Sequence, residues 1–239
     1  MSDGDALMAA ILAHPDEDVP RLAYADWLDE TGGAAERDRA EFIRAQVALA
    51  RVPPVEFVPW NERVIALRAR EKALLAARGG EWLAPLCGRG GPLEPPAHGL
   101  LRRGFVEVIW MPAAWFPARA ARLFALAPVR ELRVTHTTLN DLSDVVWGEH
   151  FPRLNALDMS DRRLGDDVAR VLAFRSTSAG LRTLRLSACG LTDWSAHSLA
   201  QAPFHWPLRE LDVRHNDFTP YGVTALRARF GAEAVLTGG

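Results

Sequence analysis

The stretch LRTLRLSACGL, residues 181–191, places leucines at a fixed spacing and continues with Cys189 and Gly190, where the chain is expected to turn. The same pattern of apolar positions occurs three more times, as VRELRVTHTTL at 129–139, LNALDMSDRRL at 154–164 and LRELDVRHNDF at 208–218. The second leucines of the copies are 25, 27 and 27 residues apart, at Leu132, Leu157, Leu184 and Leu211. Such a regular interval is typical of stacked structural repeats.

Helical patterns lie before, between and after the four copies, at 112–128, 139–151, 164–174, 191–203 and 218–230. The copies and the helices between them resemble leucine-rich repeats of the ribonuclease-inhibitor type. This resemblance implies a parallel sheet on the concave side of a short solenoid and helices on its convex side. A weaker copy occurs at 106–111, and 232–239 is interpreted as a truncated closing strand. The sequence therefore predicts an α/β fold, with an arc of about five repeats and a C-terminal cap over 100–239. Each repeat needs a neighbour to cover its apolar face.

The first third of the chain has a helical pattern instead. Apolar residues recur at helical spacing over 2–14, 18–33, 35–51 and 59–80, and charged residues occupy the other positions. Ser2 and Asp5 have the spacing of a capping box at the start of the first helix. A segment dense in Gly and Pro follows, and such residues interrupt regular structure. We therefore predict a small helical bundle over 1–87 and a Gly/Pro linker over 88–99, with the bundle partly capping the first strand of the arc.

Motifs in this helical region resemble the bacterial repeat-companion domain, a short helical module that precedes repeat arrays. The resemblance covers roughly residues 5–86 and implies no catalytic activity. The chain departs from the family pattern at His14 and at the apolar insertion VEFVPW, residues 55–60. The residues that carry the resemblance are Pro15, Asp16, Asp18, Arg21, Tyr24, Asp26, Trp27, Leu28, Glu41, Phe42, Ile43, Gln46, Glu81 and Trp82.

The composition of the chain argues against several classes of function. The chain has 239 residues, 49% of them hydrophobic, and a formal net charge of −2, which argues against a general nucleic-acid binder. It contains no apolar run long enough to span a membrane and does not begin with a secretory signal, so a cytoplasmic location is expected. The two cysteines, one in each half, provide no disulfide framework. The sequence contains no phosphate-loop, dinucleotide-binding or His/Cys zinc motif, so no cofactor or metal is predicted.

Cys189 is the first candidate for chemistry. It occupies the repeat position at which a strand turns and an inward polar side chain satisfies backbone groups of adjoining turns; the other copies have Thr137, Arg162 and Asn216 there. A buried thiol without a neighbouring base is inert. His197 falls in the following helical segment, away from the strand, and Cys87 has no reactive context. We interpret Cys189 as a scaffold residue and predict no catalytic residue.

An acidic cluster, HPDEDVP at 14–20 together with Asp26 and Asp29, is the second candidate. Carboxylate oxygens suit hard cations, so a metal-dependent hydrolase using His14, Asp16 and Asp26 is an alternative function. The spacing matches no metal-binding loop, and carboxylates that precede a helix are expected as caps. The structural interpretation is therefore preferred.

The predicted concave face is the third candidate. Side chains alternate along a strand, so the leucines point into the core and Trp110, Arg133, Asp158, Arg185 and Asp212 form one exposed column. This column allows two interpretations. Alternating charges can neutralise each other in a solvated ladder, whereas arginine beside tryptophan is the usual composition of a binding hot spot. Trp110 is expected to meet either the N-terminal domain or a partner. The residues that flank the column are Glu131, Thr183, Glu210 and Arg214.

These patterns favour a non-enzymatic protein-interaction module that binds a protein partner through its repeat surface. The alternatives are the metal-dependent hydrolase described above and a structural subunit of a larger assembly. No nucleic-acid or membrane partner is predicted. Because leucine-rich repeats bind many unrelated proteins, neither the identity of the partner nor the oligomeric state follows from the sequence.

Overall fold

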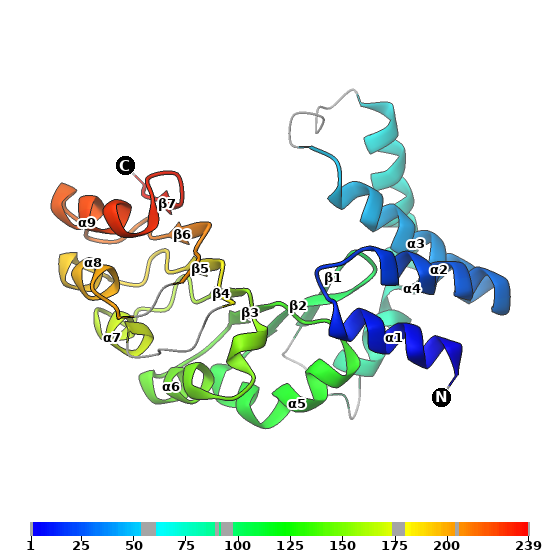
Figure 1. The fold of residues 1–239 in the computed structure, drawn as a ribbon, viewed down its shortest axis with the longest axis horizontal. Helices are drawn as coiled ribbons and strands as arrows, with labels where there is room; N and C mark the ends of the chain where they lie inside the picture. The colour runs from blue at the N-terminus through cyan, green and yellow to red at the C-terminus, as the bar shows by residue number, and fades with distance from the viewer. Residues whose placement is uncertain are drawn as a thin grey trace. The chain divides into compact units, whose positions relative to one another are not determined.

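The computed structural model describes residues 2–53, 61–88, 91, 98–173, 180–203 and 206–238. The insertion at 55–60 and most of the predicted linker 88–99 lie outside these residues. The described chain is a mixed α/β protein (Figure 1), as the sequence predicts. It divides into two compact units. The first contains Met1–Val108 with Arg122–Val129, and the second contains Ile109–Ala121 with Arg130–Gly239.

The first unit contains a helix in each of the four predicted segments. These helices are α1 (Asp3–Ala13), α2 (Val19–Thr31), α3 (Ala34–Ala50) and α4 (Glu62–Cys87). The predicted capping box is present, because the Ser2 hydroxyl accepts a hydrogen bond from the Asp5 amide and the Asp5 carboxylate accepts one from the Ser2 amide. Apolar faces of α1, α2 and α3 meet in a core that includes Ile11, Ala25, Ile43 and Phe105. Burial of these faces is the main source of the unit's stability.

Helix α4 is longer than the sequence predicts. The predicted helical segment ends at Gly80, whereas the helix continues through Gly79 and Gly80 to Cys87. Each glycine lowers helix stability by about 1 kcal/mol relative to alanine, but the last two turns pack against the rest of the unit. The Trp82 ring lies 4.5 Å from the Phe42 ring, measured between centroids, and Leu86 is buried. Tertiary packing therefore outweighs the local signal.

A tight turn joins two further strands, β1 (His98–Arg102) and β2 (Phe105–Met111). The sequence predicts β2 but not β1. Both residues of the turn have positive φ, 47° at Arg103 and 88° at Gly104, as two-residue hairpin turns of type I′ require. A Cβ atom at Gly104 would lie 2.4 Å from Cγ1 of Ile43, so glycine is needed there for close packing as well as for the backbone conformation.

The second unit is built on short parallel strands. They are β3 (Glu131–Val134), β4 (Ala156–Asp158), β5 (Thr183–Arg185), β6 (Glu210–Asp212) and β7 (Val235–Leu236). Among the described residues, the strands form one sheet in the order of the sequence, from β1 to β7. The second leucines of the four sequence copies pair with one another across β3–β6, and all four are fully buried. The pairing thus has the register that the repeat predicts.

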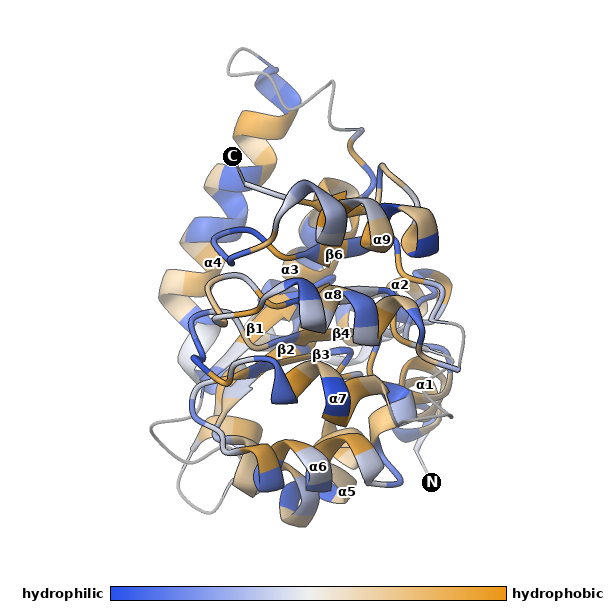
Figure 2. Cartoon of the chain, turned by 90° about the vertical axis from the view of Figure 1, so that its left-hand side faces the viewer, coloured by the Kyte–Doolittle hydropathy of each residue, from blue (hydrophilic) through white to orange (hydrophobic). Residues whose placement is uncertain are grey.

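Helices follow the strands in the predicted segments. They are α5 (Phe116–Leu126), α6 (Leu139–Trp147), α7 (Asp167–Ala173), α8 (Asp193–Ala200) and α9 (Pro220–Phe230), with 3-10 turns η2 (Ala113–Trp115) and η3 (Phe151–Arg153). Helices α6 to α9 lie in a row along one side of β3–β6 (Figure 1). In Figure 2 each carries hydrophobic and hydrophilic segments, as amphipathic helices do.

Aspartates connect neighbouring helices of this row. The Asp166 carboxylate accepts hydrogen bonds from the amide and hydroxyl groups of Thr192, the N-cap residue of α8. Asp193, 27 residues later, does the same for Thr219 at the start of α9. Each carboxylate therefore holds the N-cap threonine of the following helix in place, which ties successive strand–helix segments together.

Candidate functional site

The outward side chains of β3–β6 form a continuous set in the second unit. Because alternate residues face opposite sides of a strand, the buried leucines leave Arg133, Asp158, Arg185 and Asp212 in one row across the sheet. A second row contains Glu131, Thr183 and Glu210, two residues earlier on their strands. We call the set that the sequence predicts the strand-face cluster. Its members are Trp110, Glu131, Arg133, Asp158, Thr183, Arg185, Glu210, Asp212 and Arg214.

Glu131 is the centre of the charge network. Its side chain is only 3% exposed, and its Oε1 atom accepts hydrogen bonds from Arg133 Nε at 2.6 Å and Arg185 Nη1 at 3.1 Å. Arg185 also donates from Nε to Glu210 Oε1 at 2.7 Å, and its Nη1 lies 4.0 Å from Asp158 Oδ2. Burial disfavours the charged form of Arg185, but the carboxylates of Glu210 and Glu131 outweigh that effect and raise its pKa. The network therefore links β3, β4, β5 and β6.

The observed pairing differs from a simple ladder along one row. Arg133 and Arg185 hydrogen-bond to glutamates of the other row: Arg133 to Glu131 of its own strand, and Arg185 to Glu210 and Glu131 of other strands. An arginine side chain is long enough to reach beyond the spacing of about 4.8 Å between neighbouring strands. Asp212 pairs with Arg214, two residues after the end of β6, whose Nη2 lies at 2.6 Å, and Asp212 is buried rather than exposed. Burial acts to raise the pKa of Asp212, but hydrogen bonds from Arg214 lower it overall.

Trp110 lies at one end of the cluster and is half-buried. The guanidinium carbon of Arg133 lies 4.7 Å from the centroid of its ring, a cation–π contact. Arg133 therefore connects Trp110 to Glu131 in one assembly of side chains. Thr183, on β5, is half-buried and lies in register with Ala156 and Glu210.

Cys189 lies away from this face and is fully buried, as the scaffold interpretation predicts. Its Sγ atom donates to the Met159 carbonyl at 3.2 Å, and its amide donates to Asn216 Oδ1 at 3.0 Å. The Asn216 amide nitrogen in turn donates to the carbonyls of Leu186 and Val213. Burial raises the pKa of Cys189 to about 11, so the thiol is protonated at neutral pH and is a poor nucleophile.

The acidic region of the first unit is engaged in ion pairs and backbone contacts. Asp26 accepts from Arg44, the Asp16 carbonyl accepts from Arg103, and His14 lies 3.5 Å from Glu17. Within the residues that the structure describes, no group of three His, Cys, Asp or Glu side chains is placed to hold a metal ion. The donors of the hydrolase alternative are thus not assembled into a ligand set in this part of the chain.

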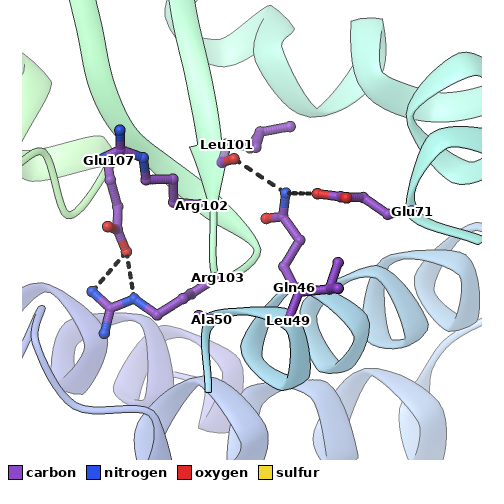
Figure 3. A pocket seen from close by; sticks show the side chains of 8 residues that line it. All are labelled: Gln46, Leu49, Ala50, Glu71, Leu101, Arg102, Arg103 and Glu107. Atoms are coloured by element: carbon purple, nitrogen blue, oxygen red, sulfur yellow. Dashed lines mark hydrogen bonds and ion pairs between the residues drawn. The ribbon is translucent and has the colours of Figure 1, made fainter. Parts of the chain in front are cut away.

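A pocket of about 220 Å³ lies beside the hairpin turn in the first unit (Figure 3). On one side of it, Glu107 Oε1 accepts from Arg103 Nη2 at 2.8 Å and from Arg21 Nη2 at 2.8 Å. On the other side, Gln46 Nε2 donates to Glu71 and to the Leu101 carbonyl, while its Oε1 accepts from the Gly104 amide. These polar atoms satisfy each other, and they hold the hairpin against α2 and α3.

Sequence reasoning did not find this arrangement. In the sequence, Arg21 and Gln46 are notable only as residues of the family resemblance, and Glu107 belongs to the predicted strand at 106–111. The available signal was a charged residue at an apolar position, because Arg21 and Glu107 both replace core side chains. A charge at such a position indicates a buried partner.

Comparisons with known proteins identify no family: no protein-family model matches the chain, and no curated protein matches it either. In the described part of the chain, no helix is both long and apolar enough to cross a membrane. The side chains that the fold brings together are therefore the basis for assigning a function. The strand-face cluster is the largest such group among those that the sequence predicts.

Proposed function

We propose that this chain is a protein-binding module in which a helical repeat-companion domain precedes a short arc of leucine-rich repeats. The period of the four copies, the parallel in-register strands and the helix after each strand support the repeat assignment. The partner protein binds the strand-face cluster, which in this assignment is the concave face of the arc. A cytoplasmic location remains part of the proposal.

The arginine and tryptophan contacts of the cluster carry this proposal. Arg133 stacks on Trp110 and shares Glu131 with Arg185, so the aromatic and cationic groups are held in place before a partner arrives. Arginine and tryptophan are enriched among the hot spots of protein interfaces. Side chains that are already ordered also lose less conformational entropy when a partner binds.

The charge balance of the cluster limits the kind of partner. Three arginines face four carboxylates, those of Glu131, Asp158, Glu210 and Asp212. A nearly neutral, internally paired face does not attract a highly charged ligand over a long distance. It suits a protein segment with mixed polar and apolar groups, which exchanges hydrogen bonds with the rim and covers the tryptophan.

The test is affinity capture from native lysate with the wild-type chain and two double variants. The first, Trp110→Ala with Arg185→Ala, removes the tryptophan and one of the three arginines of the cluster. The second, Trp147→Ala with Arg170→Ala, removes the same residue types from α6 and α7, where Trp147 is 63% exposed. We expect a specific protein, identified by mass spectrometry, to be retained by the wild type and the control variant and lost with the cluster variant.

Equal capture by all three proteins, or loss with both variants, refutes the concave-face assignment. The two alternative functions have separate readouts. A rise in melting temperature with divalent cations that His14→Ala abolishes supports the hydrolase. Elution of the native protein in a large complex that does not depend on the cluster supports a structural subunit.

A further inference from the structure

A second cavity in the first unit is small and mainly apolar. Its volume is about 130 Å³, and all its lining residues belong to that unit. Aromatic rings of Tyr24, Trp82 and Phe105 and the side chains of Met8 and Leu86 form much of its wall. An engineered cavity of about 150 Å³ holds a benzene molecule, so this cavity has room for a ligand group of about that size.

Arg39, on α3, provides the cavity with a cation. The guanidinium carbon lies 4.7 Å from the centroid of Trp82, 5.4 Å from that of Phe105 and 5.8 Å from that of Phe42. Within the described residues, its Nη1 atom is shielded from solvent and has no hydrogen-bond partner. Burial lowers the pKa of Arg39 to about 10, so the side chain remains charged at neutral pH.

Arg21, the fully buried arginine of the unit, provides a comparison. Arg21 also has one shielded atom without a hydrogen-bond partner among the described residues, Nε, but its Nη2 atom lies 2.8 Å from Glu107 Oε1 and donates to the Pro15 carbonyl at 2.7 Å. Arg39 has aromatic faces and no carboxylate among the described residues. Cation–π contacts offset part of the desolvation of a guanidinium, but they do not supply an acceptor for the N–H donors of Nη1. An anionic acceptor is the missing complement of such a site.

We propose that this cavity binds a small carboxylate that has a compact apolar body. The carboxylate oxygens accept hydrogen bonds from the Arg39 guanidinium, and the apolar body packs against Trp82 and Phe105. Ligand sites commonly combine apolar walls with a few polar groups that orient the ligand, and arginine is well shaped for carboxylate recognition. This site shares no residue with the strand-face cluster, so it does not depend on the proposed protein-binding function.

The probes are butyrate and benzoate, each compared with its neutral amide at equal ionic strength. Binding is followed by isothermal titration calorimetry and by the indole NMR signal of Trp82, assigned with Trp82→Phe. We expect saturable binding of the acids with a Kd of ~1 mM, a magnitude reasonable for so small a ligand, and no binding of the amides. An acetylated, amidated Gly-Gly-Glu-Gly-Gly peptide tests whether a protein side chain supplies the carboxylate instead.

Two variants test the site directly. Arg39→Met should weaken binding of the acids at least tenfold, while Arg37→Met, an exposed arginine on the same helix, should leave it unchanged. Ala127→Leu fills the cavity and should also prevent binding, which keeps the proposal testable if Arg39→Met does not fold. Three results would overturn the proposal. The acids and the amides bind equally well; the affinity for the acids is unchanged in Arg39→Met or in Ala127→Leu; or no probe binds at concentrations up to 50-fold above the expected Kd of ~1 mM.

Discussion

Glu107→Leu tests how the hairpin is held to the helices of the first unit. Arg21 is fully buried, and its charge partner is Glu107, whose Oε1 lies 2.8 Å from Arg21 Nη2. Removing one member of a buried ion pair leaves an uncompensated charge, which typically costs about 3–5 kcal/mol. Arg103, the second cation on Glu107, is more exposed and can turn toward Asp18, so it adds less. We therefore expect unfolding free energy to fall by about 3–5 kcal/mol.

A double-mutant cycle isolates the pair. Arg21→Met combined with Glu107→Leu replaces both charges by apolar groups of similar size, and such replacements are often neutral or stabilising. The double variant should therefore be more stable than Glu107→Leu alone. Glu41→Leu is the matched control, because Glu41 pairs with Arg70 on the exposed surface of α3 and its loss should change stability by less than about 1 kcal/mol.

Urea unfolding measures the free energies, and amide hydrogen exchange of residues 98–108 shows whether the hairpin itself is released. The expected result is faster exchange there in Glu107→Leu and recovery in the double variant. A loss below about 1 kcal/mol in Glu107→Leu, or simple additivity in the cycle, would refute the assignment of Glu107 as the charge partner of Arg21.

Three further predictions concern single positions. Gly104→Ala should lower the melting temperature and destabilise the chain by at least about 2 kcal/mol, because Gly104 has a φ of 88° and the added Cβ would collide with Ile43. Gly80→Ala is the control: no atom lies near the added Cβ, so this change should be neutral or stabilising. Ala188→Gly should raise stability by about 1 kcal/mol in urea unfolding, because Ala188 has a φ of 54°. Cys189 should react with iodoacetamide at pH 8 about 100-fold more slowly in the folded than in the unfolded chain, since burial raises its pKa from 9.0 to about 11; equal rates would contradict its burial.

The repeat pattern predicted the strands of the second unit well. Apolar side chains at alternating positions can be buried together only if neighbouring copies pair in one register, and Leu157 and Leu184 do pair in that register. The position of Cys189 within the pattern also predicted its burial. Local signals of this kind work because strand geometry and repeat length restrict the possible arrangements.

Longer-range partners did not follow from the sequence. Helix α4 passes Gly79 because Trp82 meets Phe42 from another helix, and strand β1 forms because the hairpin turn places it beside β2. The ladder interpretation pairs Arg185 with the aspartates of its own row; Asp158 does lie 4.0 Å away, but the closest partner is Glu210, at 2.7 Å. The aromatic surroundings of Arg39 come from α3, α4 and β2, which no sequence spacing connects.

By itself, the sequence determined which positions are apolar and at what period they recur, and therefore which faces of the helices and strands are buried. Only the tertiary structure decided which charged and aromatic groups meet. The physical reason is that burial depends on the local alternation of residue types, whereas the long side chains of arginine and glutamate can pair with any oppositely charged group that the fold brings within reach. The pairing of Glu131 with Arg133 and Arg185 is one example.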